Sequence, residues 1–184
     1  MAKLIKRITA IVVIFTILFI SLYCFTSKAL FLTLAITFGT TSYHFVMRLL
    51  VAYFYNSFIN NKINYRNKWF SVSVREQQFY EKLGIKKWKN KMPTYDPRGF
   101  DVKNHSLDEI AQTMCQAELG HETIVLLSFL PILAGRWFGA YPVFIVTSVM
   151  AAIFDSIFVI MQRYNRPRLI KLMEKRKETK HIWK

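Results

Sequence analysis

The sequence has few acidic residues and few cysteines. Its 184 residues include 11 Asp and Glu against 26 Lys and Arg, so the formal net charge is +15. Cys24 and Cys115 lack the C-x-x-C spacing of a structural metal site. We expect no disulfide, because Cys24 ends the first apolar run and Cys115 lies in the cytoplasmic half of a later predicted helix. No RNP, zinc-finger or helix-turn-helix signature accompanies the positive charge, so nucleic acid is not an expected partner.

Apolar residues, by contrast, are abundant and are gathered into long runs. Hydrophobic residues make up 53% of the chain, aromatic residues make up 16%, and the mean hydropathy is +0.20. Most of the Lys and Arg lie between and after these runs. Membrane proteins collect basic residues in cytoplasmic loops, where anionic lipid attracts them. This segregation predicts an all-α integral membrane protein.

Four of the apolar runs are suited to cross a bilayer, which takes about 20 residues of helix. We place these spans in a single membrane domain, at residues 8–25, 29–50, 118–135 and 141–161. The first run follows three basic residues, as in a signal peptide, but it is long for one and no small-x-small cleavage site follows. We therefore interpret it as a signal anchor.

Two polar segments carry most of the positive charge. The loop at residues 56–105 holds eleven Lys and Arg against four acidic residues, and the tail at residues 162–184 holds nine against two. The positive-inside rule places both segments, and the basic amino terminus, in the cytoplasm. The sequence therefore predicts a multi-pass cell-membrane protein with both termini cytoplasmic, which an even number of spans allows.

Part of the basic loop has the pattern of an amphipathic helix. Residues 75–91 place Phe79, Leu83, Ile85 and Trp88 among lysines. This pattern predicts an interfacial helix that lies along the membrane surface. Prolines beginning at Pro93 then break the chain.

The ends of the third and fourth helices carry recognisable signals. Ser106 and Glu109 form the pattern of a capping box, which predicts the start of the third helix. We expect this helix to pass through Pro131 unbroken, because membrane helices tolerate proline. We expect the fourth helix to end near Gln162, where Pro167 would stop it and expose polar side chains.

Ionisable residues within membrane spans are costly and are therefore functional candidates. His44 and Arg48 stand one turn apart near the cytoplasmic end of the second span, and Asp155 lies about two turns from the end of the fourth. Glu118 and His121 are three residues apart on the third helix and share a face. The topology places all five in one layer, which would allow a single polar site. Arg48 and Asp155 could instead form a structural ion pair, and both interpretations stay open.

These residue types suit acyl transfer. His121 would take a proton from a hydroxyl as general base, and Glu118 would fix its tautomer and stabilise the imidazolium. Acyl transfer also needs donors for the developing oxyanion. The candidate substrate-binding residues are Gln162, Arg163, Asn165, Arg166, Arg48, His44 and Asp155. No metal ligand set is predicted, and no cofactor apart from an acyl donor as co-substrate.

Three segments resemble the glycosyl-4,4′-diaponeurosporenoate acyltransferase family. They are FYEKLGIKKWK at residues 79–89, AELGH at 117–121 and QRYNRPRL at 162–169. The resemblance implies a small membrane enzyme that moves a fatty acyl group onto a hydroxyl of a membrane amphiphile, a glycosyl-carotenoid in the namesake. The expected partners are a membrane lipid or glycolipid acceptor and a donor that is a CoA thioester, a carrier-protein thioester or a phospholipid. The acceptor and the oligomeric state are left open.

Two other classes fit the composition. A membrane methyltransferase of the isoprenylcysteine type is likewise small and multi-span, but the sequence has no Arg-His-Pro segment and no late glutamate pair for that chemistry. A non-enzymatic lipid-binding membrane protein would need only the basic loop and tail.

Overall fold

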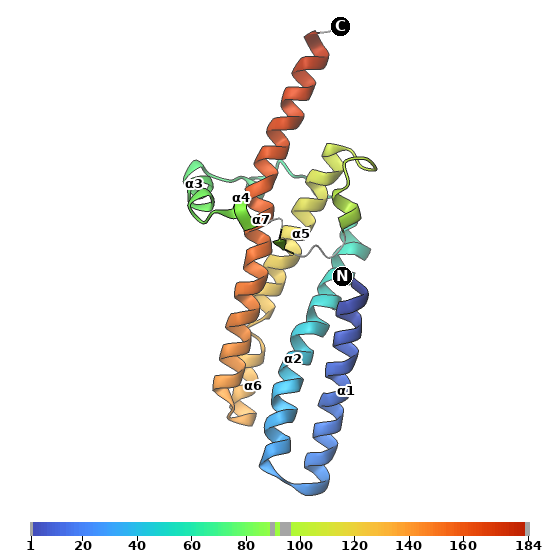
Figure 1. The fold of residues 1–184 in the computed structure, drawn as a ribbon, viewed down its shortest axis with the longest axis vertical. Coiled ribbons are helices and arrows are strands. Elements are labelled where there is room, and N and C mark those ends of the chain that lie inside the picture. Colours follow the sequence, from blue (N-terminus) through green and yellow to red (C-terminus); the bar gives the residue numbers. More distant parts are fainter. Residues whose placement is uncertain (1, 89–90, 93–96, 183–184) are drawn as a thin grey trace. The chain divides into compact units, whose positions relative to one another are not determined.

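The protein is built of helices. A computed structural model describes residues 2–88, 91–92 and 97–182, and within these ranges it is 84% helical and has no strand (Figure 1). Four helices are long and apolar enough to span a membrane. The chain is therefore an all-α integral membrane protein, as the apolar runs predicted. It packs as two compact units, Met1–Tyr53 with Glu122–Asp155, and Phe54–His121 with Ser156–Lys184.

The first unit begins with a helical hairpin. Helix α1 (Ala2–Thr26) and helix α2 (Ala29–Phe54) lie side by side and are joined by a tight turn in which Ser27 has a φ of 52° (Figure 1). The hydroxyl groups of Thr16 and Ser42 are 2.9 Å apart and share a hydrogen bond between the helices. Many large apolar side chains of this unit are exposed, Ile14 to 63% and Leu30 to 65%, as a lipid environment requires.

The third membrane helix is interrupted at Pro131, which differs from the unbroken helix expected. Helix α5 (Leu107–Leu127) ends in a short turn, and helix α6 (Pro131–Phe138) begins with the proline itself. A proline at the first position of a helix loses no hydrogen bond, because that N–H has no partner inside the helix. Gly139, with a φ of 68°, then turns the chain into helix α7 (Tyr141–Ile182).

The second unit contains the polar loop and the short helices that follow α2. These are the π-helical turn η1 (Tyr55–Ile59), η2 (Lys68–Phe70), α3 (Val74–Lys82), α4 (Ile85–Trp88) and η4 (Pro97–Phe100). The single amphipathic helix expected at residues 75–91 is divided into α3 and α4 by Gly84, whose φ is 65°. The first part of α5 and the last part of α7 complete the unit. The expected break at Pro93 lies outside the described residues.

The two helix-end predictions have opposite outcomes. The capping box is confirmed, since Glu109 N donates to Ser106 Oγ at 3.2 Å and Ser106 N donates to Glu109 Oε2 at 2.7 Å. The predicted end near Gln162 is wrong, because α7 continues through Pro167 to Ile182. Proline removes one backbone hydrogen bond from a helix. The side-chain contacts described next hold α7 on both sides of that position.

Candidate functional site

A buried carboxylate between two arginines forms the centre of the second unit. Glu118 on α5 has a fully buried side chain. Its Oε1 accepts a hydrogen bond from Arg163 Nη1 at 2.8 Å, and its Oε2 accepts one from Arg166 Nη1. Arg166 is only 1% exposed. Buried charges need partners of this kind, because an isolated charge in a medium of low dielectric is very costly.

A second carboxylate, that of Glu76, forms an ion pair with Arg163. Arg163 Nε donates to Glu76 Oε1 at 2.6 Å, and Tyr80 donates its hydroxyl to the same oxygen at 2.5 Å. Partial burial acts to raise the pKa of Glu76, but the bonds from Arg163 and Tyr80 hold it below its usual value. Burial and the bond to Glu76 raise the pKa of Tyr80 to about 12, so its hydroxyl stays protonated. Two carboxylates and two guanidinium groups thus form a neutral cluster.

Backbone carbonyls satisfy the remaining arginine donors. The carbonyls of Trp69 and Ser71 accept from Arg163 at 3.3 and 3.2 Å, and the carbonyl of Phe70 accepts from Arg166 at 2.5 Å. The Phe70 ring also lies 5.0 Å from the Arg166 guanidinium carbon, in a cation–π contact. The cluster therefore fixes four pieces of chain together: α3, α5, α7 and the segment at 69–71.

Helices α3 and α4 pack on α7 beside this cluster. Tyr80 and Ile85 form a buried apolar core with Tyr164. Arg168 stacks on the Tyr164 ring at 3.6 Å and donates to Glu81 at 3.2 Å. The described parts of the three segments singled out in the sequence, 79–88, 117–121 and 162–169, therefore meet in one unit.

His121, the predicted base, lies on α5 one turn after Glu118. Its ring is half-buried and stacks on Phe158 of α7, with 4.7 Å between centroids and 12° between planes. Both oxygens of Glu118 bind arginine, so the described contacts assign that carboxylate to the arginine cluster. The proposed bond from Glu118 to His121 stays a prediction. Gln162 and Asn165 are half-buried on α7, and their binding roles are likewise untested.

The first unit holds a separate ion pair. Arg48 Nε donates to Asp155 Oδ2 at 3.0 Å, with Asp155 1% exposed, so the ion pair that the sequence allowed is present between α2 and α7. Arg48 also donates to the carbonyls of His44 at 3.0 Å and Ala151 at 3.5 Å. His44 is 5% exposed, and neither ring nitrogen has a hydrogen-bond partner among the described atoms. Substrate binding by these residues stays a prediction.

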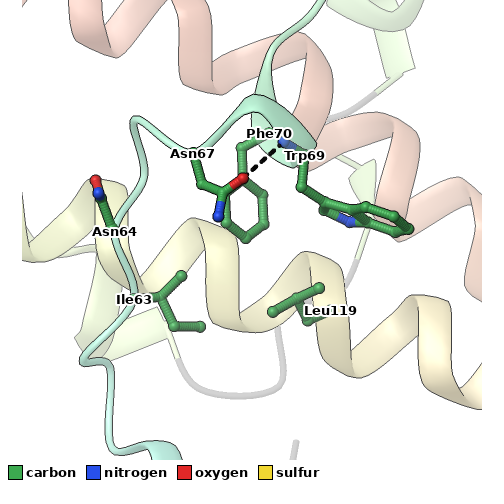
Figure 2. Close-up of a pocket in the computed structure, with 6 residues that line it drawn as sticks. All are labelled: Ile63, Asn64, Asn67, Trp69, Phe70 and Leu119. Carbon is green, nitrogen blue, oxygen red and sulfur yellow. Dashed lines mark hydrogen bonds between the residues drawn. The ribbon is translucent and has the colours of Figure 1, made fainter.

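A hollow of about 390 Å³ opens beside the arginine cluster, in the second unit (Figure 2). It is lined by Ile63, Asn64, Asn67, Trp69, Phe70 and Leu119. The last of these follows Glu118 on α5, and the others belong to the loop after α2. No sequence pattern indicated this hollow, because its walls come from distant parts of the chain.

The described residues include both cysteines of the chain and side chains of the types that bind metal ions. No group of three or more His, Cys, Asp or Glu side chains within them could hold a metal ion. Cys24 is exposed and Cys115 is buried, and both thiols are free.

Comparison with known proteins identifies the family. The glycosyl-4,4′-diaponeurosporenoate acyltransferase family model matches residues 55–175. The chain belongs to this family. No curated protein and no solved structure gives a significant match. The family region contains the whole arginine cluster, the hollow, His121 and Asp155, whereas His44 and Arg48 precede it.

Glu76, Tyr80 and the three backbone carbonyls of the cluster were not predicted from the sequence. Ser73 and Glu76 have the spacing of a helix start, and Ser73 does accept a bond from Glu76 N at 3.2 Å. That spacing could have located α3. Nothing in it indicates that Glu76 would reach Arg163, 87 residues further along the chain.

Proposed function

We propose that the chain is a membrane acyltransferase that moves a fatty acyl group onto a hydroxyl of a membrane glycolipid. The observation that carries this proposal is the family match over residues 55–175. The family's description names a glycosylated diaponeurosporenoate, so a glycosylated apolar amphiphile is the acceptor class that we propose here.

We assign the base to His121. It would accept the hydroxyl proton while the hydroxyl oxygen attacks the carbonyl carbon of the acyl donor. The tetrahedral intermediate would then collapse and expel the leaving group, and the protonated His121 would give its proton to that group. The stack on Phe158 supports this role because it limits the rotation of the imidazole ring. A carbonyl placed beside the ring would require donors for its oxyanion.

The arginine cluster would position these groups. The guanidinium groups of Arg163 and Arg166 are bound by carboxylates and carbonyls, so we propose that they hold α5 against α7. The amides of Gln162 and Asn165, on the same stretch of α7, are then the proposed oxyanion donors. Glu118 lies one helical turn from His121 and would act on the site through Arg163 and Arg166.

The test is acyl transfer by the purified full chain in nanodiscs. General-base catalysis contributes about 10²–10⁴-fold, so His121→Ala should lower the rate by about that factor at equal amounts of folded protein. His105→Ala, which removes an exposed histidine near the start of α5, is the matched control and should retain the rate. A near-normal rate in His121→Ala would end the base assignment. Tolerance of that variant in cells, without any transferase activity, would favour a lipid-binding protein.

We also propose that the termini and the loop at 56–105 face the cytoplasm, because all three carry the basic excess. An introduced cysteine tests this orientation. In a Cys24→Ala background, Lys82→Cys should resist an impermeant thiol reagent in intact cells and react after the cells are opened. Labelling in intact cells would place the loop, and the proposed site, on the outer face.

A further inference from the structure

We propose that the hollow lined by Ile63, Asn64, Asn67, Trp69, Phe70 and Leu119 binds the adenine nucleotide of a coenzyme A thioester, which would be the acyl donor. This inference rests on the proposed acyltransferase function and names the donor class for it. Five of its six lining residues belong to the loop after α2, and no sequence pattern gave any of these five a role.

The lining of the hollow suits a flat heteroaromatic group. Trp69 and Phe70 both line the hollow (Figure 2), and Trp69 is 63% exposed whereas Phe70 is 6% exposed. Phe70 is held in place by its cation–π contact with Arg166. Aromatic side chains are common stacking surfaces for nucleobases. A volume of about 390 Å³ is within the range of small-molecule sites.

Two amides at the edge of the hollow can orient such a ring. Asn64 Oδ1 accepts a bond from Arg66 N, and Asn67 Oδ1 accepts one from Trp69 N, both at 3.0 Å. These bonds hold each amide oxygen against the backbone. The Nδ2 group of each amide is then the end that can donate to a ring nitrogen of adenine.

The charge of this segment favours an anionic ligand. Residues 60–72 include Lys62, Arg66 and Lys68, all exposed, and no acidic residue. Glu118, next to Leu119, is neutralised by its arginines. Asp108, which accepts a hydrogen bond from the Tyr65 hydroxyl at 2.7 Å, is one acidic side chain beside these three cations, so the phosphate groups of a bound nucleotide would still meet an excess of positive charge.

The position of the hollow relative to His121 favours a long donor over the acceptor sugar. Leu119 and His121 are two residues apart on α5 and so point about 200° apart around the helix. A sugar held in the hollow would present its hydroxyl groups away from the proposed base. The pantetheine arm of coenzyme A is longer than a helix is wide, so its thioester could reach the His121 face while the nucleotide stays in the hollow.

Direct binding of coenzyme A to the full chain in nanodiscs tests the inference without requiring catalysis. Base–aromatic stacking corresponds to a factor of about 5–150 in affinity, and Trp69→Ala should weaken binding by that amount. Trp137→Ala is the matched control, since Trp137 is an exposed tryptophan on α6, and it should bind as the wild type does. Lys68→Ala should weaken binding and reduce its salt dependence, whereas Lys171→Ala on α7 should not.

The outcomes separate the inference from the proposed function. No binding at about 1 mM coenzyme A, or equal affinity in Trp69→Ala and Trp137→Ala, would overturn the site. Acyl transfer from a phospholipid or a carrier-protein thioester, without coenzyme A binding, would overturn it and leave the proposed function standing. Binding that depends on Trp69 in a chain without transferase activity would support the site and remove the function. With acyl-CoA as donor, Trp69→Ala should raise KM and change kcat little.

Discussion

Removing the charge of Glu118 should destabilise the protein strongly. Glu118→Gln preserves the shape of the side chain but takes the carboxylate away from Arg166, which is 1% exposed. Arg163 would keep its second partner, Glu76. The cost therefore comes mainly from one buried guanidinium group left without an opposite charge.

The magnitude follows from that burial. Breaking a buried ion pair by removing one partner typically costs about 3–5 kcal/mol, a large part of the 5–15 kcal/mol that stabilises most proteins. For a chain of this size, each kcal/mol corresponds to about 2–4 °C, so Tm should fall by about 6–20 °C. Glu81→Gln is the matched control, because the pair of Glu81 with Arg168 is about half exposed and should contribute at most about 1 kcal/mol.

Thermal unfolding of the purified protein in one detergent measures these differences. The double variant Glu118→Gln with Arg166→Met removes both charges and should be more stable than Glu118→Gln alone. Two results would refute the reasoning. One is a Glu118→Gln protein within about 2 °C of the wild type, and the other is a double variant whose loss equals the sum of the single losses.

Two further predictions concern the other charged contacts. Arg48→Met or Asp155→Asn alone should lower Tm more than the double variant does, because each single change leaves one charge unpaired within the membrane. If the losses in the same unfolding assay are additive, Arg48 and Asp155 are not energetically coupled. Because the folded-state pKa of Glu76 is lowered, its stabilisation is present at neutral pH and is lost as the pH falls below about 4.3, the usual value for Glu. The Tm difference between wild type and Glu76→Gln should therefore shrink between about pH 5 and 3, and a constant difference would exclude this linkage.

The sequence alone was sufficient for the four apolar spans and for the cap at the start of α5. A run such as Tyr141–Met161 has a single charge, so its transfer into a bilayer depends on local composition and needs no knowledge of neighbours. The capping box at Ser106 and Glu109 is equally local, because its two bonds join residues three apart. The Arg48–Asp155 pair was also predictable, since a buried charge in a membrane span requires an opposite charge at a similar depth.

Only the tertiary structure showed which side chains the polar residues bind. Glu118 lies nearer to His121 in sequence, yet its oxygens bind Arg163 and Arg166, more than forty residues away. The same contacts explain why α7 continues through Pro167, since helix packing can exceed the cost of one lost backbone bond. Local sequence rules describe what a segment prefers by itself. The pairing of Glu118 with Arg163 and Arg166, and the hollow beside Trp69, both depend on packing between segments that are distant in the sequence. A short sequence pattern does not contain that information.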